Sequence, residues 1–137
     1  MILVDTSVWI DYFNGRETPQ TNILDTALIN DFVAIGDLIL LEILQGIKVE
    51  REYQKTKIAL AALEQYEMFG HQMVEKCAQN FRFLRKKGST IRKINDVIIA
   101  TFCIENNLAL LFSDRDFIPF VEHLGLVSVS ATTLLKD

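Results

Sequence analysis

The amino-acid sequence predicts an α/β fold with a mainly parallel sheet that helices cover on both faces. Three observations support this class. Wholly apolar runs of three to five residues recur along the chain, stretches with helical periodicity separate them, and half of the 137 residues are hydrophobic. Short buried strands that alternate with helices are typical of parallel sheets, because each crossover between parallel strands places a helix on one face.

The first predicted strand is the apolar run 2–4, and three residue types that cap helix N-termini follow it at once in segment 5–7. A short, largely apolar helix comes next and ends at Gly15. Apolar residues at helical spacing predict a second helix over residues 17–30, and residues 32–35 form the second candidate strand. The order strand, helix, helix, strand suits a parallel pair.

The middle of the chain begins with a predicted helix over residues 38–47 that is apolar on nearly every side, so we expect it to be buried. Glu42 interrupts this apolar helix. Residues 49–63 combine charges with apolar residues at helical spacing, which predicts an amphipathic surface helix. Residues 66–69 form a short candidate strand.

The last part of the chain predicts two long helices and two strands. Apolar residues at helical spacing mark residues 72–87, where Gly88 is placed to end the helix, and residues 94–106. The clearest later strand covers residues 108–112, and a weak last strand covers residues 126–129.

Composition favours one soluble domain over residues 1–137, since about 100–200 residues make one domain and the net charge is a modest −4. No apolar run approaches the roughly 20 residues of a membrane span, and Asp5 and Asp11 interrupt the N-terminal stretch, which argues against a signal peptide. Cys77 and Cys103 are too few for a disulfide framework, so we expect buried thiols in a cytoplasmic protein.

Four aspartates occupy positions at which a parallel sheet binds ligands. Asp5 and Asp114 stand at the ends of predicted strands, and ligands of such folds bind beyond the carboxyl ends of the strands. The plain alternative for either residue is a helix cap, although the two residues after Asp5 are also good caps. Asp116 either caps the helix that follows or shares a site with Asp114. Asp96 stands in the first turns of its helix, where the dipole favours a negative charge.

Glu42 is harder to explain as a structural residue. A carboxylate in a buried helix costs several kcal/mol unless it is paired or bound to a metal. The positions three and four residues away hold no Arg or Lys, so a distant group or a metal ion must compensate the charge. A cluster of Glu42 with the aspartates would offer only oxygen ligands, which favours Mg²⁺ or Mn²⁺ over zinc. Carboxylate-held Mg²⁺ serves phosphoryl chemistry.

Positive charge is concentrated just before Asp96. Between Glu75 and Asp96 there is no acidic residue, although the whole chain is negatively charged. Such a run is usually a solvated helix face, and the alternative is a surface that holds a phosphate backbone beside the metal site. The residues that would form this surface are Arg82, Arg85, Lys86, Lys87, Arg92 and Lys93.

Four segments resemble the PIN-domain ribonucleases and, more closely, the VapC toxins of bacterial toxin–antitoxin pairs. They occur in the family's order, and the resemblance covers essentially the whole chain. Each segment alone is a weak signal, and the four together are specific. The segments are Ile2-Leu3-Val4-Asp5-Thr6-Ser7-Val8-Trp9-Ile10, Leu41-Glu42-Ile43-Leu44, Ile94-Asn95-Asp96-Val97-Ile98-Ile99-Ala100 and Leu111-Phe112-Ser113-Asp114-Arg115-Asp116-Phe117.

The resemblance implies a three-layer α/β/α fold and Mg²⁺-dependent endonucleolytic cleavage of RNA, with Mn²⁺ as an alternative ion. By motif, the catalytic acids would be Asp5, Glu42, Asp96 and Asp114. The expected metal ligands are Asp5, Asp96, Asp114 and Asp116, and family members differ in which aspartate of the last pair faces the metal. Thr6 and Ser113 match polar positions that line the same pocket.

The resemblance also implies partners. They are an RNA substrate, with transfer RNA the first candidate, a small VapB-like antitoxin that covers the acidic pocket, and a second copy of the chain in a homodimer. Tight pairing with an antitoxin would account for exposed apolar residues on the first helices. The six basic residues of the acid-free segment become candidate RNA-binding residues.

Other doubly wound folds also place aspartates at strand ends. A receiver domain requires an acid pair after the first strand, but Thr6 follows Asp5. A phosphatase of the haloacid dehalogenase type requires a second aspartate at the position of Ser7. A catalytically silent PIN domain that serves as a binding or regulatory module stays open, although the intact set of acids argues against it.

Overall fold

The central sheet has four parallel strands in the computed structural model, which describes residues 1–130. The strands are β1 (Ile2–Val4), β2 (Val33–Gly36), β3 (Glu64–Tyr66) and β4 (Ala109–Leu111). Their order across the sheet is β3-β2-β1-β4. Ile2 in β1 is in register with Val33 on one side and with Ala109 on the other. The parallel sheet that the sequence predicts is confirmed.

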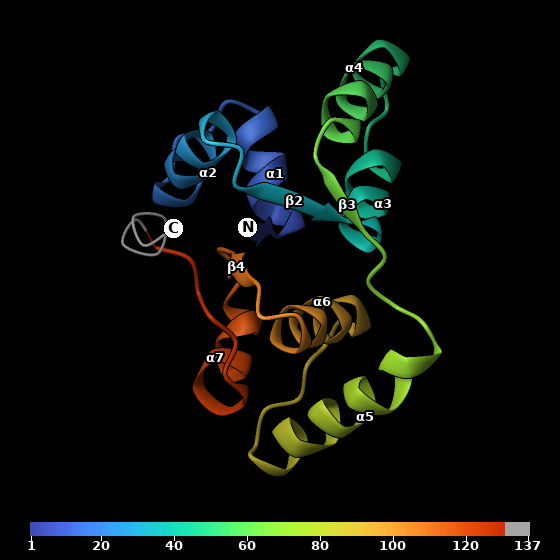
Figure 1. Ribbon diagram of the computed structural model, residues 1–137, viewed down its shortest axis with the longest axis vertical. Helices are drawn as coiled ribbons and strands as arrows, with labels where there is room; N and C mark the ends of the chain where they lie inside the picture. Colours follow the sequence, from blue (N-terminus) through green and yellow to red (C-terminus); the bar gives the residue numbers. More distant parts are fainter. Residues whose placement is uncertain (131–137) are drawn as a thin grey trace.

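Helices cover both faces of this sheet. They are α1 (Thr6–Phe13), α2 (Pro19–Ile29), α3 (Asp37–Gln45), α4 (Glu50–Ala61), α5 (His71–Lys86), α6 (Ile94–Glu105), the 3-10 turn η1 (Arg115–Phe117) and α7 (Ile118–Leu124). In Figure 1, α1 to α4 lie on one side of the sheet and α5 to α7 on the other, so the three-layer α/β/α architecture is confirmed. No helix within residues 1–130 is long and apolar enough to cross a bilayer.

The helix boundaries follow local chemistry. Thr18 and Thr21 form a reciprocal capping box at the start of α2, where Pro19 occupies a position that has no hydrogen bond to lose. Gly88 follows α5 with a φ of 93°, as its predicted place at the helix end requires. Gly125 ends α7 in the left-handed region with a φ of 80°.

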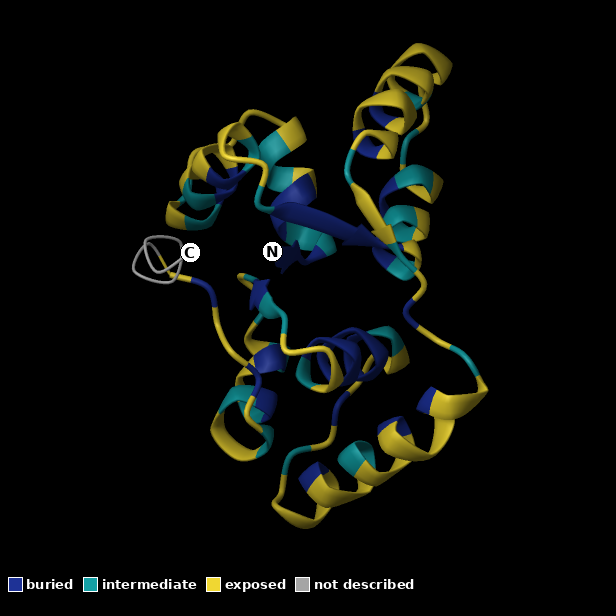
Figure 2. Ribbon diagram, viewed as in Figure 1, coloured by how far each residue is buried: buried dark blue, intermediate teal, exposed yellow. Residues whose placement is uncertain are grey.

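The centre of the core is formed by the sheet and α6. Every residue of β1 and β2 is buried, and α6 is buried continuously from Asp96 to Cys103. Figure 2 shows this contrast, with β2 and α6 largely dark blue and the outer faces of α4 and α5 yellow. Because α6 is an inner helix, the carboxylate of Asp96 in its first turn is shielded from bulk water.

The expectation that the helix over residues 38–47 is buried on nearly every side is wrong. Only Ile39 and Ile43 of α3 are buried, and Leu41 is 57% exposed. The helix packs one face against the rest of the protein, leaves Leu38, Leu40 and Leu44 partly exposed and presents Leu41 to solvent. A sequence that is apolar all round does not show which face is covered, and here part of the apolar surface is uncovered.

Two predicted strands also differ from the structure. The strand expected over residues 66–69 lies at Glu64–Tyr66, because this is the segment whose backbone pairs with Ala34–Gly36. The weak strand expected over residues 126–129 is reduced to a single parallel bridge between Leu110 and Ser128. Backbone pairing depends on which segment reaches the sheet edge in register, which short apolar runs do not specify.

Candidate metal centre

Two aspartates emerge at the same edge of the sheet. β1 and β4 are adjacent and parallel, so the residues after them lie side by side at the carboxyl edge. The amide of Asp5 donates a 2.9 Å hydrogen bond to the carbonyl of Leu111, which extends the pairing beyond Val4. Asp114 caps η1, because its Oδ1 accepts a 2.9 Å hydrogen bond from the amide of Asp116. The capping alternative considered for Asp114 is therefore confirmed for η1, whereas the N-cap of α7 is Phe117 and not Asp116.

Asp96 reaches this edge from the helix layer. It lies in the first turn of α6, and the residue is only 6% exposed. Carboxylate oxygens of Asp96, Asp114 and Asp116 all lie within 4.8 Å of one another. We call these three residues the acid cluster. The fold thus gathers acids from α6 and from the segment after β4.

One oxygen of Asp96 has no hydrogen-bond partner. Its Oδ2 is buried and accepts no hydrogen bond from the described part of the chain. Burial raises the pKa of Asp96 to about 7, the charge of Asp5 adds to the rise, and Lys93 opposes it. A buried carboxylate oxygen without a donor is costly, and a hard divalent cation would satisfy it. The oxygen-only donor set of the acid cluster fits Mg²⁺ or Mn²⁺.

Asp5 is a buried neighbour of the acid cluster. It stands at the N-cap position of α1, yet its side chain makes no capping hydrogen bond. Burial raises the pKa of Asp5, and a hydrogen bond from the Ser7 hydroxyl to Oδ2, at 2.9 Å, lowers it in part. Ser7 Oγ also lies 3.3 Å from Ser113 Oγ. From the sequence alone, Ser7 is considered only as a helix cap. Its position two residues after Asp5 is the sequence feature that could have indicated a hydrogen bond to the Asp5 carboxylate.

Glu42 meets a hydroxyl group instead of a cation. The residue is half-buried on α3, and its Oε1 accepts a 2.8 Å hydrogen bond from Thr6 Oγ1. Its negative charge contributes to the raised pKa of Asp5, so the two carboxylates are electrostatic neighbours. The negative charge of Glu42 is therefore stabilised partly by its partial exposure to solvent and partly by the hydrogen bond from Thr6, the residue next to Asp5.

Two basic residues approach the acid cluster. Lys93 Nζ lies 3.7 Å from Asp114 Oδ2, and Arg92 Nη2 lies 3.3 Å from Asp116 Oδ2. Both belong to the short segment before α6, and Lys93 is the N-cap residue of that helix. The acid-free segment is thus in contact with the acids at its C-terminal end.

The other four basic residues lie at a different place, in the second half of α5 and at its end. Arg85 lies over the ring of Phe81 at 5.5 Å from the ring centre, and Lys87 lies over the ring of Phe83 at 5.4 Å. No ion pair of these four is found among residues 1–130. The group consists of Arg82, Arg85, Lys86 and Lys87. The predicted basic surface therefore has a paired part at the acids and an unpaired part on α5.

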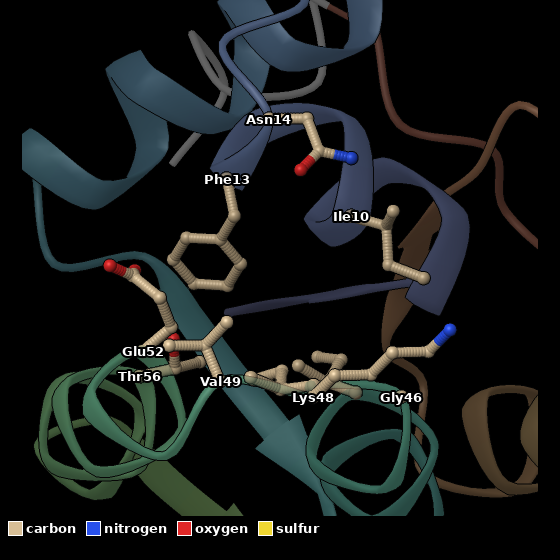
Figure 3. Close-up of a pocket in the computed structure, with 10 residues that line it drawn as sticks. Ile10, Phe13, Asn14, Gly46, Lys48, Val49, Glu52 and Thr56 are labelled. Atoms are coloured by element: carbon tan, nitrogen blue, oxygen red, sulfur yellow. The ribbon is translucent and has the colours of Figure 1, made fainter.

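A pocket of about 320 Å³ lies on the other helix layer, between α1 and the connection from α3 to α4. Figure 3 shows Phe13 and Val49 on opposite walls of the pocket, with Lys48 and Glu52 on the same side as Val49. Ile10 and Phe13 are substantially exposed, as expected for apolar residues of the first helices, and so is Val49 before α4. The pocket is separate from the acid cluster, whose residues do not line it.

The chain is similar in sequence to two curated proteins. Ribonuclease VapC11 of Mycobacterium tuberculosis and VapC ribonuclease Mb1587 of Mycobacterium bovis are each 27% identical to the chain over 119 residues. Each alignment covers 85% of this chain and 89% of the relative.

Solved structures share the fold. VapBC2 from Rickettsia felis, bound to a DNA fragment from its promoter, aligns with a TM-score of 0.68 and 24% identity, over 95% of this chain and 98% of that chain. FitAcB from Neisseria gonorrhoeae aligns with a TM-score of 0.65 and 16% identity, over 95% and 96% of the two chains. The family model described as PIN domain matches residues 2–120. This chain belongs to the PIN domain family.

Proposed function

We propose that the chain is a cytoplasmic, single-domain endoribonuclease toxin of the VapC type that depends on Mg²⁺ or Mn²⁺. The observation that carries this proposal is the buried, unpartnered Oδ2 atom of Asp96 inside the acid cluster. Such an atom destabilises a domain that binds no cation, whereas it is a ready ligand in one that does. The similarity to proteins named ribonuclease VapC supports the same activity.

The residues of the site divide into holding and orienting groups. Asp96, Asp114 and Asp116 would hold the ion, with Asp5 as a further ligand beside them. When bound, the ion supplies an activated water and balances charge on the phosphodiester. Glu42 uses Oε1 for the Thr6 hydroxyl, which leaves Oε2 to accept the proton of the attacking water.

Hydrolysis of this kind leaves 5′-phosphate and 3′-hydroxyl ends on the RNA. The other polar groups of the site would set the position of its acids. Ser7 bridges Asp5 and Ser113, and this pair of serine hydroxyls restrains the Asp5 carboxylate at the end of β1. Thr6 does the same for Glu42. Asp5, Glu42, Asp96 and Asp114 remain the proposed catalytic acids.

We propose that RNA, with transfer RNA the first candidate, lies along α5 and the segment before α6. Arg82, Arg85, Lys86 and Lys87 lack acidic partners within residues 1–130 and are free to bind phosphates. Reversing the charge of Arg85, Lys86 and Lys87 should weaken RNA binding and flatten its salt dependence by about one unit of slope per lost contact. An unchanged slope would return α5 to the role of a solvated face.

We propose two protein partners. The pocket between α1 and the α3–α4 connection combines exposed apolar side chains of Ile10, Phe13 and Val49 with polar residues at its α4 side, which suits an amphipathic helix of a VapB-like antitoxin. Phe13→Asp should abolish antitoxin capture while RNA cleavage persists, because the pocket is separate from the acid cluster. We also propose a homodimer, which light scattering of the isolated chain would test by giving twice the 15.7 kDa chain mass.

The activity is tested with total RNA, in Mg²⁺, in Mn²⁺ and in EDTA. We expect Asp5→Asn and Asp96→Asn to lower cleavage by about a hundredfold or more, since each removes a carboxylate from the site. Asp31→Asn is a matched control, because Asp31 is exposed with a φ of 56° that asparagine tolerates. Wild-type cleavage by both site variants would remove the assignment of the metal centre.

The test also separates an enzyme from a silent PIN domain. If the wild-type chain binds its antitoxin but cleaves no RNA with either ion, the chain is a binding or regulatory module. Mapping the cut ends identifies the substrate and shows whether they carry the 5′-phosphate that water attack leaves.

A further inference from the structure

Two basic side chains of the protein form ion pairs with two of the three carboxylates of the acid cluster. Arg92 pairs with Asp116 at 3.3 Å and Lys93 pairs with Asp114 at 3.7 Å. The third carboxylate, that of Asp96, has a buried Oδ2 without a hydrogen-bond partner among residues 1–130. The pairs therefore sit on the two more exposed acids and leave the most buried acid of the cluster unsatisfied.

These ion pairs can dissociate at little cost in free energy. The side chains of Arg92 and Lys93 are 78% and 62% exposed, whereas those of Asp116 and Asp114 are 22% and 28% exposed. Exposed ion pairs at such distances contribute little free energy and exchange readily with other ions. Each cation can turn outward into solvent without unfolding α6, while the carboxylates stay where the fold holds them.

We propose that Arg92 and Lys93 are resident counter-ions of the acid cluster, which a divalent cation displaces and which then bind RNA phosphates. This inference rests on the proposed function, since it assigns a second state to the same site. The three carboxylates and the neighbouring Asp5 carry up to four negative charges, of which Arg92 and Lys93 balance two. A divalent ion balances the other two and competes for the same oxygens, so the attraction that holds the two side chains inward is weakened and a phosphate anion becomes their natural partner.

The position of Lys93 supports this coupling. As the N-cap residue of α6 it lies three residues before Asp96, and its charge opposes the rise in the pKa of Asp96 that burial causes. Lys93 thus stabilises the ionised cluster when no metal is bound and would weaken metal binding for the same reason. The basic residues of α5 have no such contact, so the two halves of the basic segment have different roles.

The first test is the affinity of the RNA-free protein for Mn²⁺, measured by titration calorimetry. We expect Arg92→Gln and Lys93→Gln to bind Mn²⁺ about two- to fivefold tighter each, as the loss of one exposed competing pair predicts. The double variant should bind about tenfold tighter. Arg85→Gln combined with Lys86→Gln removes the same charge from α5 and should change the affinity less than twofold.

Two results of this titration would overturn the inference. Equal affinities of the wild-type protein and the double variant would show that the ion pairs do not compete with the metal. An equal gain in the α5 control would show that only the net charge matters. Lys93→Arg, which keeps the cation, should bind Mn²⁺ like the wild-type protein.

The second test is the salt dependence of RNA binding to a single-stranded oligonucleotide, in a Glu42→Gln background that removes a proposed catalytic acid but none of the proposed metal ligands. In saturating Mn²⁺ the slope of log K against log salt should steepen by about 0.7 for each released cation relative to EDTA. The Arg92→Gln and Lys93→Gln double variant should lose this metal-dependent increase. A persistent increase in that variant would contradict the inference.

The two tests distinguish this inference from the proposed function. If the wild-type protein binds no Mn²⁺, the metal centre itself fails and the counter-ion role fails with it. If it binds Mn²⁺ and cleaves RNA while the double variant behaves like the wild type in both tests, only the counter-ion role is wrong.

Discussion

Thr6 Oγ1 donates a 2.8 Å hydrogen bond to Glu42 Oε1, and this bond joins the first turn of α1 to the middle of α3. It fixes one oxygen of the Glu42 carboxylate. Because Thr6 follows Asp5 directly, the position of Glu42 is tied to the end of β1. A single hydroxyl thus couples two proposed catalytic acids.

Thr6→Val tests this coupling, since valine keeps the shape and removes the donor. We expect RNA cleavage to fall by up to about tenfold and the free energy of unfolding to fall by about 1 kcal/mol, because a part-buried hydrogen bond is lost. Single-turnover cleavage and thermal unfolding measure the two effects. Thr6→Ser, which keeps the hydroxyl, should restore most of the activity.

A matched control for this variant is Thr26→Val on α2. Thr26 Oγ1 donates to the carbonyl of Asn22 on an exposed surface, so its loss should leave cleavage unchanged. If Thr6→Val cleaves RNA as fast as the wild type while unfolding at a lower temperature, the bond is structural and Glu42 does not need it.

Much of the site could be placed from the sequence, because its acids stand at the ends of strands and at the start of a helix. Asp5 and Asp114 follow strands that pair in parallel, and parallel neighbours bring their carboxyl ends together. Asp96 could be placed in a first helical turn from periodicity alone. These inferences need only the order of elements, which apolar runs and helical spacing supply.

The partners of these acids could not be placed in the same way. The contacts of Thr6 with Glu42 and of Lys93 with Asp114 depend on how helices pack, which one sequence does not specify. The burial of α3 was overestimated for the same reason, since periodicity does not show that Leu41 faces solvent. Ser7 bridges Asp5 and Ser113 only because β1 and β4 are neighbours.

Gly36 is required by close packing at the end of β2. A Cβ atom there would overlap the Sδ and Cγ atoms of Met68, whose side chain is buried. Gly36→Ala should therefore lower the free energy of unfolding by about 1–3 kcal/mol, as overpacking of a dense core does. Chemical denaturation measures this change. Gly46→Ala is the control, because its Cβ would meet nothing closer than 3.7 Å and should cost almost nothing.

The double variant Gly36→Ala, Met68→Ala checks the cause of the effect. If overlap with Met68 is responsible, the loss of stability in the double variant should be smaller than the sum of the two single losses. Strict additivity would show that Gly36 is needed for another reason.

The two thiols are buried, as the sequence predicted, and should be unreactive in the folded protein. Burial raises the pKa of Cys103 to about 12, and the charge of Asp5 adds to the rise. Burial also raises the pKa of Cys77. The thiolate is the reactive form, so an aromatic disulfide reagent at pH 8 should label neither thiol until denaturant is added. Rapid labelling of native Cys103 would contradict the buried position of α6.

Without a metal ion, the buried charge of Asp96 should lower the free energy of unfolding at neutral pH. Its pKa in the folded protein is raised to about 7, above the value of about 4 in an unfolded chain, so the folded state holds the proton more tightly. Stability gained from the protonated form is complete below about pH 4 and is lost as the pH rises toward 7. In EDTA we therefore expect the free energy of unfolding to fall across this range, as measured by denaturant titrations at successive pH values.

Asp96→Asn should flatten that slope and, at pH 7.5 in EDTA, raise the free energy of unfolding by about 1–3 kcal/mol, because a buried uncompensated charge is removed. A smaller slope should persist, since burial also raises the pKa of Asp5. Saturating Mg²⁺ should stabilise the wild-type protein and have little effect on the variant. Asp96→Asn could instead destabilise the metal-free protein at neutral pH and leave the slope intact. In that case the protein itself stabilises the buried carboxylate, and Asp96 is not held available as a metal ligand.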